Sequence, residues 1–285
     1  MEIVLARDMG FCFGVRRAVE MMEEATGTVG EMVSLGSIVH NPQVVDRLKE
    51  QGIDVITAVD QVDARPVAIT AHGVSESVVR ELEQRGVPVV DTTCPIVTRS
   101  QQWAKRLAED GFAVIVFGDP NHKEVRGVLG WAPGKVFAVT SVGEIDSLPD
   151  DLPSKVGVLS QTTETEAHFA EFVRALLERR MDHISELRVI NTLCNATTSQ
   201  QAAARELAHD VDLMVVVGGR ESANTRHLAE VARDEGVETY HVESADDIDA
   251  GWLSGHERVG VTAGASTPDD AIDAVVARLR ELAPA

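Results

Sequence analysis

The stretch VPVVDTTCPIVTRSQQWAKRLAEDG, residues 87–111, decides the fold, because its pattern recurs around every cysteine of the chain. A short apolar, β-branched run precedes Cys94, and a longer run with helical spacing of apolar residues follows it. The same order surrounds Cys12 (MEIVLARDMGF, then FGVRRAVEMMEEA) and Cys194 (LRVINTL, then NATTSQQAAARELAHD). The three cysteines therefore occupy one equivalent position in a threefold internal repeat.

The regularity continues downstream of each cysteine. His40, His122 and Ser222 each lie 28 residues after their cysteine. Strands alternate with helices along the whole chain, which predicts parallel sheets joined by right-handed crossovers. We expect an α/β fold of three similar units with small parallel sheets. A pseudo-threefold arrangement of these units would bring the thiols and the polar groups to one axis.

The three units are expected at residues 14–95, 96–192 and 193–285. The third unit lacks its last strand, and the N-terminal run EIVLA is the natural replacement, so residues 1–13 are assigned to that unit. In open parallel sheets, ligand groups gather beyond the carboxyl ends of the strands. The candidate site residues all lie in segments that follow predicted strands.

Composition excludes several classes of function. The 285-residue chain has a net charge of −20, which argues against nucleic-acid binding because that needs a basic footprint. It has neither a run of about 18 apolar residues nor a signal-peptide pattern, so we expect a cytoplasmic protein without a membrane partner. The glycine-containing runs GGRES and TAGAS fit neither the dinucleotide fingerprint nor the P-loop.

Three cysteines on equivalent loops indicate a metal site with one open coordination position. Structural zinc usually takes four ligands, often from closely spaced pairs such as C-x₂-C, and the sequence has no such pair. Thiolates far apart in sequence suit an iron–sulfur cluster with one iron left for water or substrate. Three unrelated buried thiols are the alternative, since free cysteine packs well as a small apolar residue.

Polar residues on the same loops indicate an anion site. Three histidines differ from the other six because they lie in strand-to-helix loops of the repeat: His40, His72 and His122. Imidazoles beside helix N-termini can bind an anion. The third unit offers hydroxyls and an amide from Ser222, Asn224, Ser266 and Thr267. Together these groups would hold a phosphate or a diphosphate.

Glu124 is the one acidic residue among these groups. It fits a proton donor with a raised pKa in a closed pocket, and equally a carboxylate favoured by a helix N-terminus. Thr162 and Thr163 end a strand of the same unit. One of their hydroxyls would relay a proton or orient a bound hydroxyl; the alternative is that they cap the next helix.

Short runs along nearly the whole chain carry a resemblance to a known family. In order, they are GFCFGVRRA, VHNPQVV, AHGV, DTTCPIVT, NHKEVRG, SQTT, CNATT, ESANTRHLAE and TAGAST. With these runs the chain resembles the 4-hydroxy-3-methylbut-2-enyl diphosphate reductase (LytB) family, whose reaction ends the methylerythritol phosphate route to isoprenoids. The resemblance implies reductive dehydroxylation of that allylic diphosphate to isopentenyl and dimethylallyl diphosphates.

The resemblance also implies a cofactor, site residues and partners. Its three units would surround a [4Fe-4S] cluster with one iron not ligated by the protein, held by Cys12, Cys94 and Cys194. The diphosphate would be bound by His40, His72, His122, Ser222, Asn224 and Ser266. Glu124 would be the acid, with Thr162 near the substrate hydroxyl. The implied partners are the small allylic diphosphate and an external one-electron donor of the ferredoxin or flavodoxin type.

One departure from the family and several rival interpretations are visible. Ala223 stands where some members carry a second serine, which removes one hydroxyl contact to the diphosphate. An iron–sulfur hydratase, or a reductase of another allylic diphosphate, would share the open iron. An iron–sulfur redox sensor would not need the anion site. A structural zinc protein would be colourless.

Overall fold

The computed structural model describes residues 1–283, and the chain divides into two compact units. The first unit consists of Met1–Arg16, Val39–Arg47 and Asn195–Ala285, and the second of Arg17–Ile38 and Leu48–Cys194. The division falls within two helices, α1 (Phe13–Val29) and α2 (Pro42–Glu50). Residues 284 and 285, which the predicted third unit includes, lie outside the described residues.

The first unit contains one parallel sheet of four strands in the order β1-β12-β10-β11. The strands are Glu2–Leu5, Arg258–Ala263, Leu213–Val217 and Glu238–Val242, respectively. Glu2 stands opposite Arg258 in the β1–β12 register, and Nε of Arg258 donates to Oε2 of Glu2 at 3.0 Å. The prediction that the N-terminal strand completes the last sheet is therefore confirmed.

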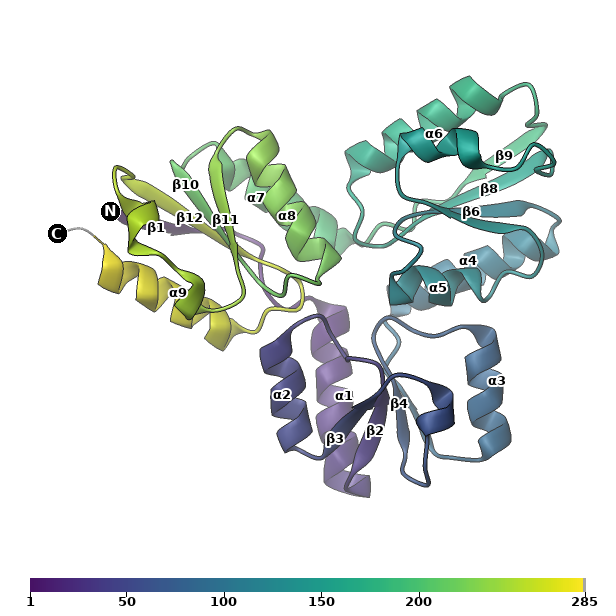
Figure 1. The fold of residues 1–285 in the computed structure, drawn as a ribbon, viewed down its shortest axis with the longest axis horizontal. Helices are drawn as coiled ribbons and strands as arrows, with labels where there is room; N and C mark the ends of the chain where they lie inside the picture. The colour runs from purple at the N-terminus through teal and green to yellow at the C-terminus, as the bar shows by residue number, and fades with distance from the viewer. Residues whose placement is uncertain (284–285) are drawn as a thin grey trace. The chain divides into compact units, whose positions relative to one another are not determined.

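Helices cover both faces of this sheet. Figure 1 shows α9 (Asp269–Leu282) on one face and α7 (Asn195–Ala208) with α8 (Ala223–Asp234) on the other. Alternate side chains of a strand point to opposite faces of the sheet, so the uniformly apolar β10 contributes to the core on both faces. Leu213, Val215 and Val217 pack with α9, whereas Met214 and Val216 pack toward α7 and α8.

The second unit contains two parallel sheets of the same size. One has the order β3-β2-β4-β5, formed by Ile53–Ile56, Met32–Leu35, Val67–Ile69 and Val89–Asp91. The other has the order β7-β6-β8-β9, formed by Val136–Val139, Ala113–Phe117, Lys155–Ser160 and Glu186–Val189. The remaining α-helices of this unit are α3 (Glu76–Arg85), α4 (Pro95–Glu109), α5 (Lys123–Leu129) and α6 (Glu166–Arg180). Short 3₁₀ helices of the chain lie at Val59–Gln61, Val142–Ser147, Ala245–Asp247 and Ala250–Leu253.

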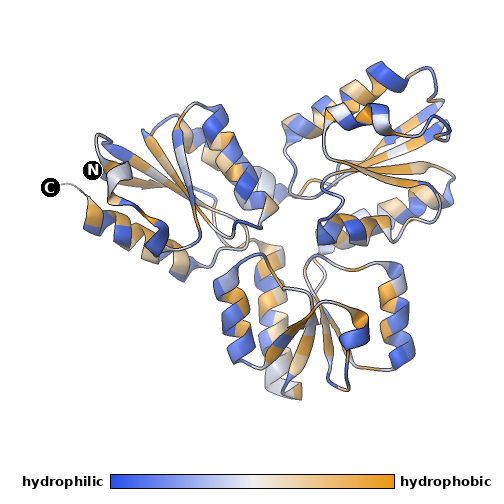
Figure 2. Cartoon of the chain, viewed as in Figure 1, coloured by the Kyte–Doolittle hydropathy of each residue, from blue (hydrophilic) through white to orange (hydrophobic). Residues whose placement is uncertain are grey.

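Apolar side chains fill both faces of the β6-containing sheet as well. Ile115 and Phe117 pack toward α6, and Val114 and Val116 pack toward α4 and α5. Figure 2 shows the apolar colouring concentrated in the strands, with polar colouring on the outer sides of the helices. Among the described residues, the structure contains no helix that is both long and apolar enough to cross a membrane.

All three sheets share one strand order. We number the strands of each sheet by their order along the chain and count β1 as the fourth strand of the last sheet. Across each sheet the strands then lie in the order second, first, third and fourth. The first and third strands are neighbours at the centre, and strand order reverses between them, which is where open parallel sheets bind ligands. The prediction of an α/β fold with three small parallel sheets is confirmed.

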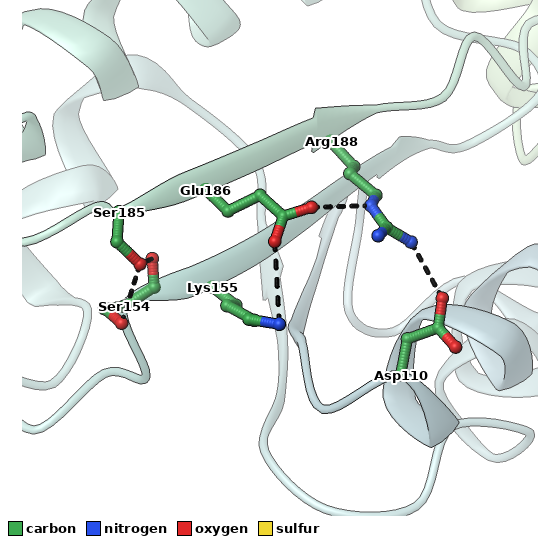
Figure 3. Close-up of polar contacts among 6 residues, drawn as sticks. All are labelled: Asp110, Ser154, Lys155, Ser185, Glu186 and Arg188. Carbon is green, nitrogen blue, oxygen red and sulfur yellow. Dashed lines mark hydrogen bonds and ion pairs between the residues drawn. The ribbon is translucent and has the colours of Figure 1, made fainter.

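The exposed edge of one sheet carries charged side chains. Figure 3 shows Glu186 and Arg188 on edge strand β9, where Nε of Arg188 donates to Oε1 of Glu186 at 3.0 Å. Arg188 also reaches Asp110 at 2.7 Å, and Lys155 on β8 lies 3.6 Å from Glu186. Charges on an edge strand disfavour pairing with another chain.

Phe172→Ala is expected to destabilise the second unit by about 3–5 kcal/mol, because a buried aromatic ring is replaced by a cavity. Phe172 is fully buried on α6, and its ring centroid lies 4.8 Å from that of Phe117. Denaturant unfolding followed by circular dichroism measures the loss. Met181→Ala, at an exposed position on the end of the same helix, is the control and should change stability by about 0.5 kcal/mol or less. Equal effects of the two substitutions would contradict this view of the core.

Candidate active site

Each cysteine directly precedes a helix and is held by the same backbone hydrogen bond. The helices are α1, α4 and α7. In each case the cysteine N–H donates to a carbonyl that lies two residues after the third strand of a sheet. The donor–acceptor pairs, at 3.1, 3.0 and 2.9 Å, are Cys12–Ala265, Cys94–Ala71 and Cys194–Thr162. The equivalence predicted for the three cysteines is thus present in the local backbone of each.

Two of the thiols belong to the second unit and interact with each other. Burial raises the pKa of the Cys94 thiol, and the charges of Cys194 and Glu124 add to that rise. The backbone N–H groups of Ile96 and Val97 act in the opposite direction. No disulfide joins the described cysteines. A half-buried Cys94 thiol whose charged form is disfavoured is suited to a cationic metal centre, which binds cysteine as the thiolate.

His72 and His122 also belong to the second unit, and their rings meet edge to face at a centroid distance of 5.6 Å. His122 caps α5, and its Nδ1 accepts the N–H of Glu124 at 3.2 Å. An accepting Nδ1 places the ring proton on Nε2, so Nε2 is the donor nitrogen of this ring. Oγ1 of Thr70 lies 3.3 Å from Nδ1 of His72.

Glu124 lies in the first turn of α5 and is only 3% exposed. Its Oε1 accepts the backbone N–H of Thr162 at 2.7 Å, and its Oε2 accepts the Thr162 hydroxyl at 2.8 Å. Burial raises the pKa of Glu124, and the two hydrogen bonds from Thr162 oppose that rise without cancelling it. A carboxyl group with a raised pKa keeps its proton to higher pH and can act as a general acid.

The alternative that Thr162 or Thr163 caps the next helix is wrong. Thr165 caps α6, because its Oγ1 accepts the N–H of His168 at 3.1 Å. Oγ1 of Thr163 accepts Nε2 of Gln161 at 3.0 Å. The helix begins at Glu166, and the Thr162 hydroxyl donates to Glu124 instead.

The first unit contains the serines and the asparagine of the predicted anion site. Ser222 caps α8, and its Oγ accepts the N–H of Thr225 at 3.3 Å. Asn224 is buried in the first turn, where its Nδ2 donates to Oε1 of Gln200 at 2.9 Å. Ser266 is buried directly after Ala265, the residue that accepts the Cys12 N–H.

His40 belongs to the first unit and follows β2. A Cβ on Gly219 would lie only 2.1 Å from the His40 carbonyl oxygen, so the loop after β10 packs directly on this backbone. Only glycine permits that approach.

Several buried oxygens of the first unit have no hydrogen-bond partner among the described residues. They are Asn224 Oδ1, Thr225 Oγ1, Thr262 Oγ1 and Ser266 Oγ. Leaving such groups unpaired costs free energy, so a cluster of them requires a physical reason. A polar ligand that binds at the start of α8 and at the end of β12 provides one.

Gln200 is a positioning residue that the sequence did not reveal. Its Nε2 donates to the carbonyl of Gly10 at 2.8 Å, while its Oε1 accepts from Asn224. It thereby connects the loop that carries Cys12 to the start of α8. A polar residue in the first turns of a helix has no distinctive spacing, so only the tertiary contact identifies it.

The predicted site residues are therefore distributed over both units. Those in the first unit are Cys12, His40, Ser222, Asn224 and Ser266. Those in the second unit are Cys94, Cys194, His72, His122, Glu124 and Thr162. Within the second unit the structure brings together a thiol pair, a histidine pair and a buried acid. Within the first, it brings hydroxyls and an amide to the loop of one cysteine.

Comparison with known proteins gives matches over the whole chain. A family model described as LytB protein matches residues 3–280. A 4-hydroxy-3-methylbut-2-enyl diphosphate reductase of Dehalococcoides mccartyi is 43% identical, over 99% of this chain and 99% of that protein. One of the same name from Geobacter sulfurreducens is 45% identical, over 99% of this chain and 98% of that protein.

Two solved structures are similar to this one. The E-1-hydroxy-2-methyl-but-2-enyl-4-diphosphate reductase of Plasmodium falciparum matches with a TM-score of 0.92 at 28% identity, covering 98% of this chain and 87% of that one. A second matches with a TM-score of 0.71 at 36% identity, over 99% of this chain and 100% of that one. It is described as (E)-4-hydroxy-3-methyl-but-2-enyl diphosphate reductase, the terminal enzyme of the non-mevalonate pathway.

Glu124→Gln is expected to change how stability depends on pH. Because burial raises the pKa of this carboxyl above 4.5, the native chain loses free energy of unfolding as the pH rises through the folded-state pKa. The glutamine variant lacks that loss, so its stability relative to the native chain should improve between about pH 4.5 and about pH 8. Denaturant unfolding of the metal-free chain at both pH values measures the difference. Glu171→Gln, at an exposed position, controls for the change in net charge. The opposite trend would show that the Thr162 hydrogen bonds outweigh burial.

Proposed function

Because this chain belongs to the LytB family, we propose that it reduces 4-hydroxy-3-methylbut-2-enyl diphosphate to isopentenyl and dimethylallyl diphosphates. The relatives that it matches over their whole length are oxidoreductases named for this substrate. The observation that carries the proposal is the position of the three cysteines. Each lies directly before a helix, and its N–H donates a hydrogen bond to a carbonyl that follows the third strand of a sheet.

The family is one of iron–sulfur enzymes, and the residues of this chain fit a [4Fe-4S] cluster. Cys12, Cys94 and Cys194 would hold three of its irons, which leaves one iron without a protein ligand. When bound, the cluster would pass electrons singly to the substrate and offer that iron as a Lewis acid. The half-buried Cys94 with its raised pKa supports this assignment, since a nearby cation would relieve the cost of its thiolate.

We assign the diphosphate to the histidines and to the start of α8. Nε2 of His122 carries the ring proton, and Ser222, whose Oγ accepts the N–H of Thr225, can donate its hydroxyl proton to the ligand. The unpaired Ser266 hydroxyl and the buried Asn224 amide would gain partners from the ligand. The full set of proposed ligands is His40, His72, His122, Ser222, Asn224 and Ser266. Ala223, at the first position of α8, offers no hydroxyl.

Glu124 and Thr162 would supply and direct the proton. In the reaction the bond from the allylic carbon to the hydroxyl oxygen breaks, and Glu124 protonates that oxygen so that it leaves as water. The remaining allyl group takes up two electrons and one further proton at either end, so the reaction consumes two electrons and two protons. The Thr162 hydroxyl, 2.8 Å from Oε2 of Glu124, would orient the carboxyl toward the substrate hydroxyl.

The electrons would come from an external one-electron donor of the ferredoxin or flavodoxin type. The absence of a flavin or nicotinamide motif from the sequence supports this assignment. We also propose that residues 14–95, 96–192, and 193–285 with 1–13 are three repeats of one unit. The common strand order of the three sheets supports that division.

Anaerobic turnover of 4-hydroxy-3-methylbut-2-enyl diphosphate tests the function directly. The full chain, reconstituted with iron and sulfide and supplied with reduced viologen, should oxidise the viologen and form both five-carbon diphosphates. Absence of turnover by protein with a verified four-iron cluster would refute the proposed substrate. The Cys94→Ser chain is the control, because it should lose both iron and rate.

Glu124→Gln should bind the substrate but turn it over about 100-fold more slowly or worse, because loss of a general acid commonly costs that much. Steady-state rates and substrate binding by calorimetry separate the two effects. Glutamine preserves the shape of the side chain and can still accept the N–H of Thr162, so the cluster content should be unchanged. Near-normal turnover with an intact cluster would show that Glu124 is not the acid.

A further inference from the structure

The second unit contains a cavity of about 390 Å³ that none of the predicted site residues lines. It lies at the carboxyl ends of three neighbouring strands, with Gly36 after β2, Thr57 after β3 and Thr70 after β4. Helix α5 contributes Lys123 and Arg126 to its wall. Cavities of this size bind small molecules, and the carboxyl edge of a parallel sheet is where such sites form.

The two cations of the cavity are not neutralised by the protein. The side chains of Lys123 and Arg126 make no hydrogen bond or ion pair to any described residue, and the charge of Arg126 adds to burial in lowering the pKa of Lys123. A Cβ on Gly36 would lie 3.0 Å from Nζ of Lys123, so the ammonium group lies against this backbone. The carboxylate of Glu124, next along the chain, is held by Thr162 instead.

One acidic residue beside the cavity, Glu76, already has cationic partners. Glu76, which follows the lining residue Ser75, binds Lys105 at 2.7 Å and Arg80 at 3.1 Å. Lys123 is half-buried, and a half-buried ammonium group without a carboxylate partner favours an anionic ligand.

The rest of the wall suits a small phosphate compound. Thr70 and Ser75 contribute polar side chains to the wall, and the Ser75 hydroxyl, whose oxygen accepts the N–H of Val78, can donate to a phosphoryl oxygen. Val59, Val74 and Val78 add an apolar surface that a short hydrocarbon group can cover. Lysine and arginine are the residues that most often bind phosphate.

We propose that this cavity binds the phosphoryl group of a small phosphate compound, with Lys123 and Arg126 as its cationic partners. The site is separate from the proposed diphosphate site and does not depend on the proposed reaction. It lies beside that site, because the buried hydroxyl of Thr70 lines the cavity and also contacts Nδ1 of His72.

Trp131 is a local reporter of the cavity. Its Nε1–H donates to the carbonyl of Val74, a lining residue, at 2.9 Å. The chain has three tryptophans, so ¹⁵N-indole labelling gives a simple spectrum in which Trp131→Phe identifies the resonance. The full chain is titrated anaerobically with inorganic phosphate and, separately, with isopentyl phosphate. The first probe tests a free ion, and the second tests an organic phosphate with an apolar group.

The expected result is a saturable shift of the Trp131 resonance with at least one probe, and the tighter probe identifies the source of the phosphoryl group. Lys123→Met with Arg126→Gln should weaken binding about tenfold or more, whereas Lys155→Met with Arg174→Gln removes the same charge elsewhere and should not. If the double variant fails to fold, Arg126→Gln alone replaces it as the test variant, because this position is exposed. It should also weaken binding.

Asn224→Ala separates this site from the proposed diphosphate site. The Trp131 shift should persist in that variant, whatever becomes of the enzymatic activity. Loss of the shift in Asn224→Ala would assign the signal to the other site and overturn the proposal. Absence of a saturable shift with both probes would also overturn it.

Discussion

Parallel pairing of the two central strands is the constraint on which both units depend. Because these strands are parallel, the carboxyl ends of the first and third strands lie at the same end of the sheet. The loops that follow the two strands must therefore lie side by side. One backbone hydrogen bond, from each cysteine to a carbonyl after the third strand, then fixes where the following helix starts. The three cysteines are therefore positioned by hydrogen bonds of the backbone.

The candidate site contains features that reduce stability. A buried carboxyl at Glu124 and unpaired oxygens such as that of Ser266 both cost free energy in the folded chain. The apolar layers on both faces of each sheet, exemplified by β6 and β10, supply the stability that offsets these costs. Functional sites commonly break local rules that the rest of a fold obeys.

The repeat and the sheets could be predicted because short β-branched runs and helical periodicity are local signals. The place of the N-terminal strand followed from counting strands in the third repeat. The candidate residues followed from their position after strands. The cap of α6 at Thr165 was missed, because Thr162 and Thr163 are equally good capping residues by type. Gln200 and the cavity beside Lys123 depend on segments far apart in the chain, which no local pattern reveals.

The place of β1 has a consequence for the order of assembly during synthesis. Glu2 and Arg258 are 256 positions apart, so β1 has no partner strand until β12 has left the ribosome. Closing so long a loop costs little more than closing a shorter one, but it cannot happen earlier. Cys12, which follows this strand, is translated before the other two cysteines and reaches its final backbone hydrogen bond last. A metal centre that requires Cys12 in its final position can be completed only after Ala265 has been made.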